Sequence, residues 1–223
     1  MEPRYARNIP ALTEAECKLL QSKRVAVIGC GGLGGHLIDQ LARIGVGFIR
    51  AVDGDVFESS NLNRQLLSEV PLLGVSKAKA AADRVARVNP DIEAEAVSVF
   101  LTHENATQII DRCDIVLDGL DNIESRKILS TACQEAGIPY VFGAIQGWLA
   151  QAAVSMPGDN LLDLLYPAGT VIRDKSVLSF TPALCASMQV SLCIKILTGR
   201  PVETGTLFCF DLLNQEFETI PLV

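Results

Sequence analysis

The segment Arg24-Val-Ala-Val-Ile-Gly-Cys-Gly-Gly-Leu-Gly34 decides the fold. Its apolar run up to Gly29 is typical of a buried parallel strand. Apolar residues then recur at helical spacing from Leu33 to Ile44, and Gly45 ends that pattern. The glycines at the turn follow a Gly-x-Gly-x-x-Gly pattern, which lets backbone N–H groups approach a phosphate at the N-terminus of the helix. The segment therefore predicts a strand–turn–helix unit that binds a nucleotide.

Strands and helices alternate along the chain on both sides of this unit. Strands are predicted over residues 48–53, 93–99, 114–118 and 139–142, and helices over 14–21, 75–88, 105–110 and 123–136. Such alternation is typical of a doubly wound parallel sheet, which binds ligands at the carboxyl ends of its strands. After Gly143 the pattern changes, and it predicts antiparallel strands over 144–156 and 207–217, a loop over 157–180 and an apolar helix over 182–197. We therefore expect one α/β domain over residues 1–223, with a Rossmann-like, doubly wound mixed sheet.

Composition and charge exclude several classes of function. Hydrophobic residues make up 49% of the chain and the mean hydropathy is +0.30, so the chain can bury a large core and is not disordered. The formal net charge is −7 and no cluster of Lys and Arg occurs, which argues against binding to nucleic acid or to an anionic membrane. No apolar run reaches the ~18 residues of a membrane span, and the polar N-terminus does not resemble a signal peptide. The seven cysteines form no Cys-x-x-Cys pair, which indicates a reducing, cytoplasmic location and no zinc site.

Polar residues that follow the second predicted strand narrow the choice of nucleotide. Asp53 ends that strand, where a carboxylate can hydrogen-bond ribose hydroxyls. With the glycine turn alone, NAD(P), FAD and ATP all remain open. Arg64 can neutralise phosphate oxygens bidentately and Asn61 can donate to them, which favours a triphosphate. Lys77 at the start of the next helix adds a positive charge, although by itself it would suggest a solvated helix face.

A second acidic motif, Asp118-Gly-Leu-Asp-Asn122, closes one predicted strand and opens the following helix. A carboxylate at the end of a strand beside phosphates commonly holds Mg²⁺, so Asp121 is the candidate metal ligand. Aspartate is also favoured at the N-cap of a helix, and capping is the alternative role for Asp121.

Together these segments resemble the MoeB/ThiF/HesA family, the ubiquitin-activating-type adenylyltransferases. The resemblance extends from Arg4 to about Phe210. It rests on Arg4-Tyr-Ala-Arg-Asn-Ile9, Gly29-Cys-Gly-Gly-Leu-Gly34, Asp53-Gly-Asp55, Ser60-Asn-Leu-Asn-Arg-Gln65, Lys77, Asp118-Gly-Leu-Asp-Asn122, residues 143–151, Ser187-Met-Gln189 and Ile194-Lys-Ile-Leu-Thr-Gly199.

The resemblance implies a role for each matched residue. Asp121 would bind Mg²⁺, and Arg7 matches the arginine that, in the family's dimers, reaches into the active site of the partner subunit. With Arg64 and Lys77, these two residues form the implied catalytic set. The implied nucleotide-binding set is Gly29, Gly31, Gly32, Leu33, Gly34, Asp53, Asp55, Ser60, Asn61, Arg64, Lys77, Asp121 and Asn122.

The implied activity is ATP-dependent adenylation. The C-terminal glycine carboxylate of a ubiquitin-like sulfur-carrier protein ending in Gly-Gly would attack the α-phosphate of ATP, which yields an acyl-adenylate and pyrophosphate. The carboxylate is itself the nucleophile, so the chemistry requires positioning and charge neutralisation and no general base. The implied assembly is a homodimer.

The sequence departs from the family pattern in its cysteines. Many members carry two Cys-x-x-Cys pairs that bind zinc, and these pairs are missing here. Members that form a thioester or persulfide place a cysteine before the long helix, but residues 134–184 contain none. Cys30 lies in the glycine turn, where a helix N-terminus is expected to lower its pKa. We therefore expect the reaction to stop at adenylation.

Three other interpretations remain open at this stage. The first is a nicotinamide-dependent oxidoreductase that uses the same glycine turn, and Arg64, Lys77 and Asp121 argue against it. The second is a non-catalytic nucleotide-binding protein, which would be expected to have lost phosphate-binding residues. The third is a family member that activates a different substrate, such as a peptide or a tRNA-bound base.

Overall fold

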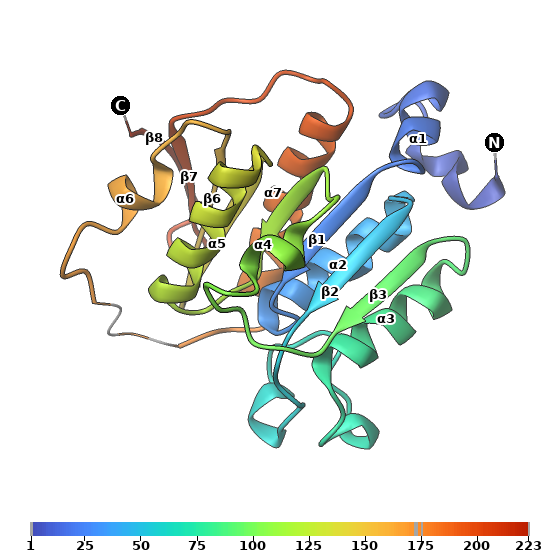
Figure 1. Ribbon diagram of the computed structural model, residues 1–223, viewed down its shortest axis with the longest axis horizontal. Helices are drawn as coiled ribbons and strands as arrows, with labels where there is room; N and C mark the ends of the chain where they lie inside the picture. The colour runs from blue at the N-terminus through green and yellow to red at the C-terminus, as the bar shows by residue number, and fades with distance from the viewer. Residues whose placement is uncertain (1, 172–173, 175, 223) are drawn as a thin grey trace.

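The computed structural model describes residues 2–171, 174 and 176–222, and its centre is an eight-stranded sheet (Figure 1). The strands lie in the order β3-β2-β1-β4-β5-β6-β7-β8. Their bounds are β1 Arg24–Ile28, β2 Phe48–Val52, β3 Glu93–Val97, β4 Ile115–Asp118, β5 Tyr140–Gln146, β6 Leu149–Ser155, β7 Thr206–Asp211 and β8 Glu216–Pro221. In this order, the five strands β3, β2, β1, β4 and β5 are parallel to their neighbours. The pairs β5–β6, β6–β7 and β7–β8 are antiparallel. The predicted mixed sheet is confirmed.

Helices cover both faces of this sheet. The apolar side chains of α2 (Gly32–Ile44), α3 (Lys77–Val88) and α7 (Phe180–Leu197) belong to one core cluster. Those of α4 (Ala106–Ile110), α5 (Ile123–Ala136) and α6 (Leu161–Leu165) belong to a second. Figure 1 shows α4 and α5 in front of the sheet and α2 behind it. The domain therefore has three layers, with the sheet in the middle.

Strand β1 lies at the point where the chain reverses its direction of winding. It pairs with β2 on one side and β4 on the other, and both neighbours are parallel to it. The connections leave β1 and β4 in opposite directions, which opens a crevice at the carboxyl ends of these strands. Gly29 follows β1 with φ +93°, and a Cβ atom there would lie 2.5 Å from the carbonyl oxygen of Gly119. Only glycine fits this close approach.

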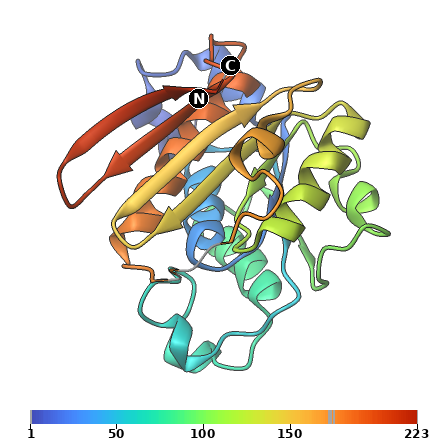
Figure 2. The same ribbon diagram turned by 90° about the vertical axis from the view of Figure 1, so that its left-hand side faces the viewer.

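The C-terminal strands differ from the prediction in their number. The predicted strand over 144–156 is the end of β5 followed by β6, and the predicted strand over 207–217 covers β7 and the start of β8. Each pair is a hairpin (Figure 2). Gly147, with φ +54°, makes the first turn, and Asp211 makes the second by accepting hydrogen bonds from the backbone of Leu213 and Asn214. Apolar residues on both sides of each turn masked the turn in the sequence.

The remaining connections are short helical segments and loops. The 3-10 helices η1 (Pro3–Asn8), η2 (Ser59–Asn61) and η3 (Val70–Leu72) and helix α1 (Glu14–Leu20) complete the elements. The predicted loop over 157–180 contains α6, because Leu161 and Leu162 are buried. Residues 172, 173 and 175 of that loop lie outside the described residues.

Helix α7 is the one helix, within the described part of the chain, that is long and apolar enough to cross a membrane. It packs against α2, β5 and β6, and 56% of it is buried inside the domain. Its apolar character is therefore accounted for by the core.

Candidate functional site

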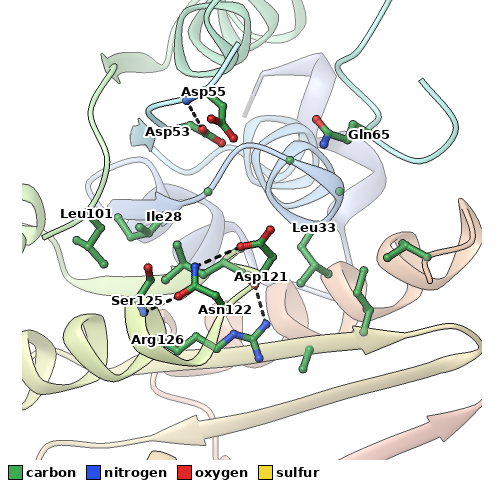
Figure 3. Close-up of a pocket in the computed structure, with 18 of the residues that line it drawn as sticks. Ile28, Leu33, Asp53, Asp55, Gln65, Leu101, Asp121, Asn122, Ser125 and Arg126 are labelled. Atoms are coloured by element: carbon green, nitrogen blue, oxygen red, sulfur yellow. Dashed lines mark hydrogen bonds between the residues drawn. The ribbon is translucent and has the colours of Figure 1, made fainter. Parts of the chain in front are cut away.

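A cavity of about 750 Å³ opens at the carboxyl ends of β1, β2 and β4. This volume falls within the range of small-molecule sites. In Figure 3, Asp53 and Asp55 lie on one side of the cavity and Asp121 and Asn122 on the other. Ten of the predicted site residues line it: Gly29, Gly31, Gly32, Leu33, Asp53, Asp55, Arg64, Lys77, Asp121 and Asn122.

Asp53 fastens the glycine loop to the end of β2. Its Oδ2 accepts a hydrogen bond from the backbone N–H of Cys30 at 2.7 Å, and its Oδ1 accepts one from the N–H of Asp55 at 2.8 Å. Burial raises the pKa of Asp53, although these hydrogen bonds and Lys77 oppose the shift. The N-cap of α2 is Gly31, and no side chain caps this helix. The first turn of α2 therefore leaves N–H groups for an anion at the cavity wall.

Lys77 points into the site from the first residue of α3. Only 7% of it is exposed, and its Nζ lies 3.2 Å from Oδ2 of Asp55. Ser76 caps the helix by accepting a hydrogen bond from the N–H of Lys79, so the helix starts directly at Lys77. The alternative interpretation, a lysine on a solvated helix face, is wrong.

Asp121 does not cap α5. The N-cap is Asn122, whose side chain accepts a hydrogen bond from the N–H of Ser125 at 2.8 Å. Asp121 is exposed to the cavity, and its Oδ1 accepts one bond of 3.3 Å from Asn122. Its carboxylate is therefore available to a cation, and capping is not its role.

The loop that carries Arg64 is held by its own polar residues. Nη1 of Arg64 donates to the carbonyl oxygen of Ser60 and to the side chain of Asn63, both at 2.8 Å. Asn61 is buried, and its Oδ1 accepts a hydrogen bond from the N–H of Glu58 at 3.0 Å. Ser60 and Asn61 shape η2 and do not line the cavity, so their predicted contacts with phosphate stay predictions.

Two further predicted residues lie away from the cavity lining. Gly34 lies beneath the glycine loop, where a Cβ atom would be 1.7 Å from the carbonyl oxygen of Gly29. Its position serves the packing of α2 against the loop. Arg7, on η1, is exposed and is not among the residues that line the cavity.

Three of the cavity residues that the sequence analysis did not single out shape the site. Gln65 is 7% exposed, its amide packs against Gly31, and its Oε1 has no hydrogen-bond partner in the described part of the chain. Phe100 is 65% exposed and its ring covers Gly54, beside Asp53. Arg126 is a buried cation of α5. The position of Gln65 directly after Arg64 was the one available signal, because the other two depend on tertiary packing.

Arg126 joins four segments around the site. Its Nη1 donates to the hydroxyl of Tyr166 at 2.7 Å, and its Nη2 donates to the carbonyl oxygens of Leu120 and Gly143 at 2.7 and 2.9 Å. Its Nε lies 3.5 Å from Oδ2 of Asp118, which is fully buried. Burial raises the pKa of Asp118, although Arg126 opposes the shift. The guanidinium therefore fixes the strand end that carries Asp121.

The burial and the pKa of Cys30, the cysteine in the glycine loop, differ from the prediction. Cys30 is fully buried, and burial raises the pKa of its thiol, with the nearby charge of Asp53 acting in the same direction. The expected lowering by the helix N-terminus is wrong. Within the described residues, no cysteine lines the cavity, and no group of three His, Cys, Asp or Glu side chains is placed to hold a metal ion.

Residues 5–222 match the family model described as the ThiF family. The chain is 35% identical to the SAMP-activating enzyme E1 of Haloferax volcanii, with 98% of this chain and 84% of that protein covered. It is 36% identical to the probable adenylyltransferase/sulfurtransferase MoeZ of Mycobacterium tuberculosis, but spans only 59% of its length. It is 33% identical to the sulfur carrier protein ThiS adenylyltransferase of Bacillus subtilis, with 97% and 67% covered.

The fold has a close counterpart among solved structures. The structure of Escherichia coli MccB with ATP superposes with a TM-score of 0.84, covering all of this chain and 72% of that one. The sequence identity is 19%, so this likeness bears on the fold alone.

Proposed function

This chain belongs to the ThiF family, and we propose that it is an ATP-dependent adenylyltransferase for the C-terminal glycine carboxylate of a ubiquitin-like sulfur-carrier protein. One observation carries the proposal. The cavity brings two cations, Arg64 and Lys77, and the uncapped start of α2 together with the free carboxylate of Asp121. This combination suits a metal-bound triphosphate and exceeds what a dinucleotide needs.

The residues of the cavity fit ATP. Asp53 lies where a ribose is bound in such folds, and the glycine loop and the start of α2 offer N–H groups to phosphate. The buried Oε1 of Gln65 has no partner in the described part of the chain and faces a cavity that a polar ligand would fill. ATP supplies an electrophilic α-phosphorus and a pyrophosphate leaving group. Asp121 would hold Mg²⁺ against the phosphate oxygens.

The chain's own residues position the reactants and neutralise charge. The carrier carboxylate oxygen forms the new bond to the α-phosphorus as the bond to pyrophosphate breaks. Arg64 and Lys77 offset the negative charge that develops, and no proton needs to be removed. The buried pair of Asp118 and Arg126 holds the strand end that carries Asp121.

The cavity offers a path for an extended peptide end. Its lining includes Ala144 of β5 and Gln151 of β6, as well as Thr170 and Val177 from the segment that precedes α7. A Gly-Gly tail has no side chains, so we propose that it enters the cavity along this wall.

The assembly we propose is a homodimer in which Arg7 completes the site of the partner subunit. Tyr5 and Asn8, on either side of Arg7 in the chain, contact Gly45 and Ile44 at the C-terminal end of α2, whereas Gly32 begins that helix. A helix of 13 residues is about 20 Å long, so Arg7 cannot reach the cavity of its own chain. We also propose a cytoplasmic enzyme without structural zinc.

Pyrophosphate exchange tests the proposed function. The purified chain, Mg²⁺, ATP, labelled pyrophosphate and a ubiquitin-like carrier ending in Gly-Gly should produce labelled ATP. The same carrier without its last glycine is the matched control and should give none. The proposal would be excluded if no carrier or peptide produced labelled ATP. It would also be excluded if calorimetry detected binding of NAD but not of ATP.

A further inference from the structure

We propose that Tyr5 and Asn89 are positioning residues that lock the N-terminal arm, residues 2–12, so that it presents Arg7 to the active site of a second copy of this chain. The inference rests on the proposed function and on delivery of Arg7 to the partner subunit. It assigns a role to a buried contact far from the cavity.

The lock is a buried hydrogen-bonded pair. Tyr5 is 3% exposed and Asn89 is 1% exposed. Nδ2 of Asn89 donates to the hydroxyl of Tyr5 at 2.7 Å and to the carbonyl oxygen of Ala42 at 3.0 Å. Oδ1 of Asn89 accepts a hydrogen bond from Arg4. One side chain at the end of α3 therefore ties the arm to the last turn of α2.

The end of α2 is shaped to receive the tyrosine. Gly45, with φ +96°, ends the helix, and the ring of Tyr5 lies directly against it. A Cβ atom on residue 45 would be 2.6 Å from that ring, so only glycine leaves room. Nδ2 of Asn8 donates to the carbonyl oxygen of Ile44 at 3.3 Å. The arm therefore contacts α2 on both sides of Arg7.

Arg7 is the exception among the polar residues of η1. Arg4 pairs with Glu2 and Asp91, both at 3.2 Å, and Asn8 bonds to α2. Arg7 is exposed and makes no hydrogen bond or ion pair with the described residues. A short polar terminus would ordinarily fray. An ordered arm with one unpaired arginine is the arrangement expected of a group that acts on another molecule.

Two mixed dimers with the same total substitutions test the proposal. The first combines a Tyr5→Ala chain with an Asp121→Ala chain, separated as a heterodimer by two affinity tags. Its single intact cavity belongs to the Tyr5→Ala chain and receives a normal arm. The second combines a wild-type chain with a Tyr5→Ala/Asp121→Ala chain. Its single intact cavity receives the unlocked arm.

We expect pyrophosphate exchange by the second heterodimer to be about a hundredfold slower than by the first, since small misplacements of a catalytic group have effects of that size. General destabilisation of the Tyr5→Ala chain would instead slow the first heterodimer, because its intact cavity belongs to that chain. Equal rates would overturn the proposal, and so would a slower first heterodimer or a fully active monomer. Wild-type protein that is inactive with every carrier would instead contradict the proposed function.

Amide hydrogen exchange provides a readout that does not depend on activity. Tyr5→Phe keeps the ring but removes the hydroxyl that Asn89 binds, and it should speed exchange in residues 3–12 only. Tyr140→Phe is the matched control, because it removes another buried tyrosine hydroxyl, 2.6 Å from Asp118, and should leave the arm unchanged. Unchanged exchange in the arm of Tyr5→Phe would overturn the lock.

Discussion

Asp53 has two structural partners before any ligand arrives, and this makes its substitution informative. Both carboxylate oxygens accept hydrogen bonds from backbone N–H groups. Asp53→Asn would replace one of these oxygens by an NH₂ group, which cannot accept the hydrogen bond. We expect ATP affinity to fall by about 1.5–3 kcal/mol, the size of a hydrogen bond to a charged group. Calorimetry with Mg-ATP measures this, and an unchanged affinity would contradict the proposed ribose contact.

The same residue predicts a pH dependence. In the proposed complex the ionised carboxylate would accept ribose hydroxyls, and burial raises the pKa of Asp53 above its ordinary value of 3.8. ATP affinity of the wild type should therefore decline as the pH falls, at a higher pH than for a solvated aspartate. Asp53→Asn should not show this decline.

Substitutions of Asp121 and Arg64 are expected to remove activity with little effect on stability. Both are at least partly exposed, and their contacts are local hydrogen bonds. Asp121→Ala and Arg64→Ala should abolish pyrophosphate exchange while the free energy of unfolding changes by less than about 1 kcal/mol. Asp163→Ala, which removes an exposed carboxylate 3.4 Å from Lys127, is the control and should keep activity. Loss of the fold in either test variant would mean that the residue is structural.

Several of the residues that line the cavity could be predicted because they follow strand ends in sequence. Asp53 and Asp121 each stand just past a buried strand, and the glycine turn follows β1 directly. Arg126 and Phe100 could not be predicted, because an arginine inside a helix and a phenylalanine in a loop acquire a role only through their neighbours. The predicted lowering of the Cys30 pKa is wrong for the same reason, because tertiary packing buries the thiol and burial raises its pKa.

At the scale of elements, Arg126 connects β4, β5, α5 and the end of α6. Arg126→Leu would leave the fully buried Asp118 without its charge partner, although Tyr140 still donates to it at 2.6 Å. Removing one partner of a buried ion pair destabilises proteins by about 3–5 kcal/mol. Chemical denaturation should show a loss of this size. Arg112→Leu, which removes an exposed arginine 3.4 Å from Asp111, should lose less than about 1 kcal/mol.

Helix α1 is tied to the end of α7 by an ion pair. Nε of Arg200 lies 2.6 Å from Oε1 of Glu16, and this bond, with the N–H of Thr13, lowers the pKa of Glu16 from 4.5 to about 2. A lowered pKa stabilises the fold above pH 4.5, and that contribution is lost as the pH falls toward 2. Glu16→Gln should melt below the wild type at pH 7, and the difference should shrink between pH 4.5 and pH 2. A constant difference would contradict the assignment.

The C-terminal elements were harder to predict than the N-terminal ones. Strands β1, β2 and β4 are buried between helices and read as apolar runs with polar ends. Apolar residues flank the turn between β5 and β6, so the single strand predicted over 144–156 covers the end of β5 and all of β6. Helix α6, five residues long, is held by the burial of Leu161 and Leu162, and its N-cap residue, Asn160, makes no side-chain capping hydrogen bond.

At the scale of the whole molecule, the position of Arg7 makes a quantitative prediction about assembly. The proposed twofold dimer has two composite sites, each with Asp121 from one chain and Arg7 from the other. Arg7→Ala chains and Asp121→Ala chains should each be inactive alone. Random mixing at equal amounts gives half heterodimers, each with one intact site, so exchange should recover to about a quarter of the wild-type rate. Arg87→Ala, another exposed arginine, at the last turn of α3, is the control and should be active alone. Mixtures that stay inactive, or sedimentation of a fully active monomer, would refute the composite site.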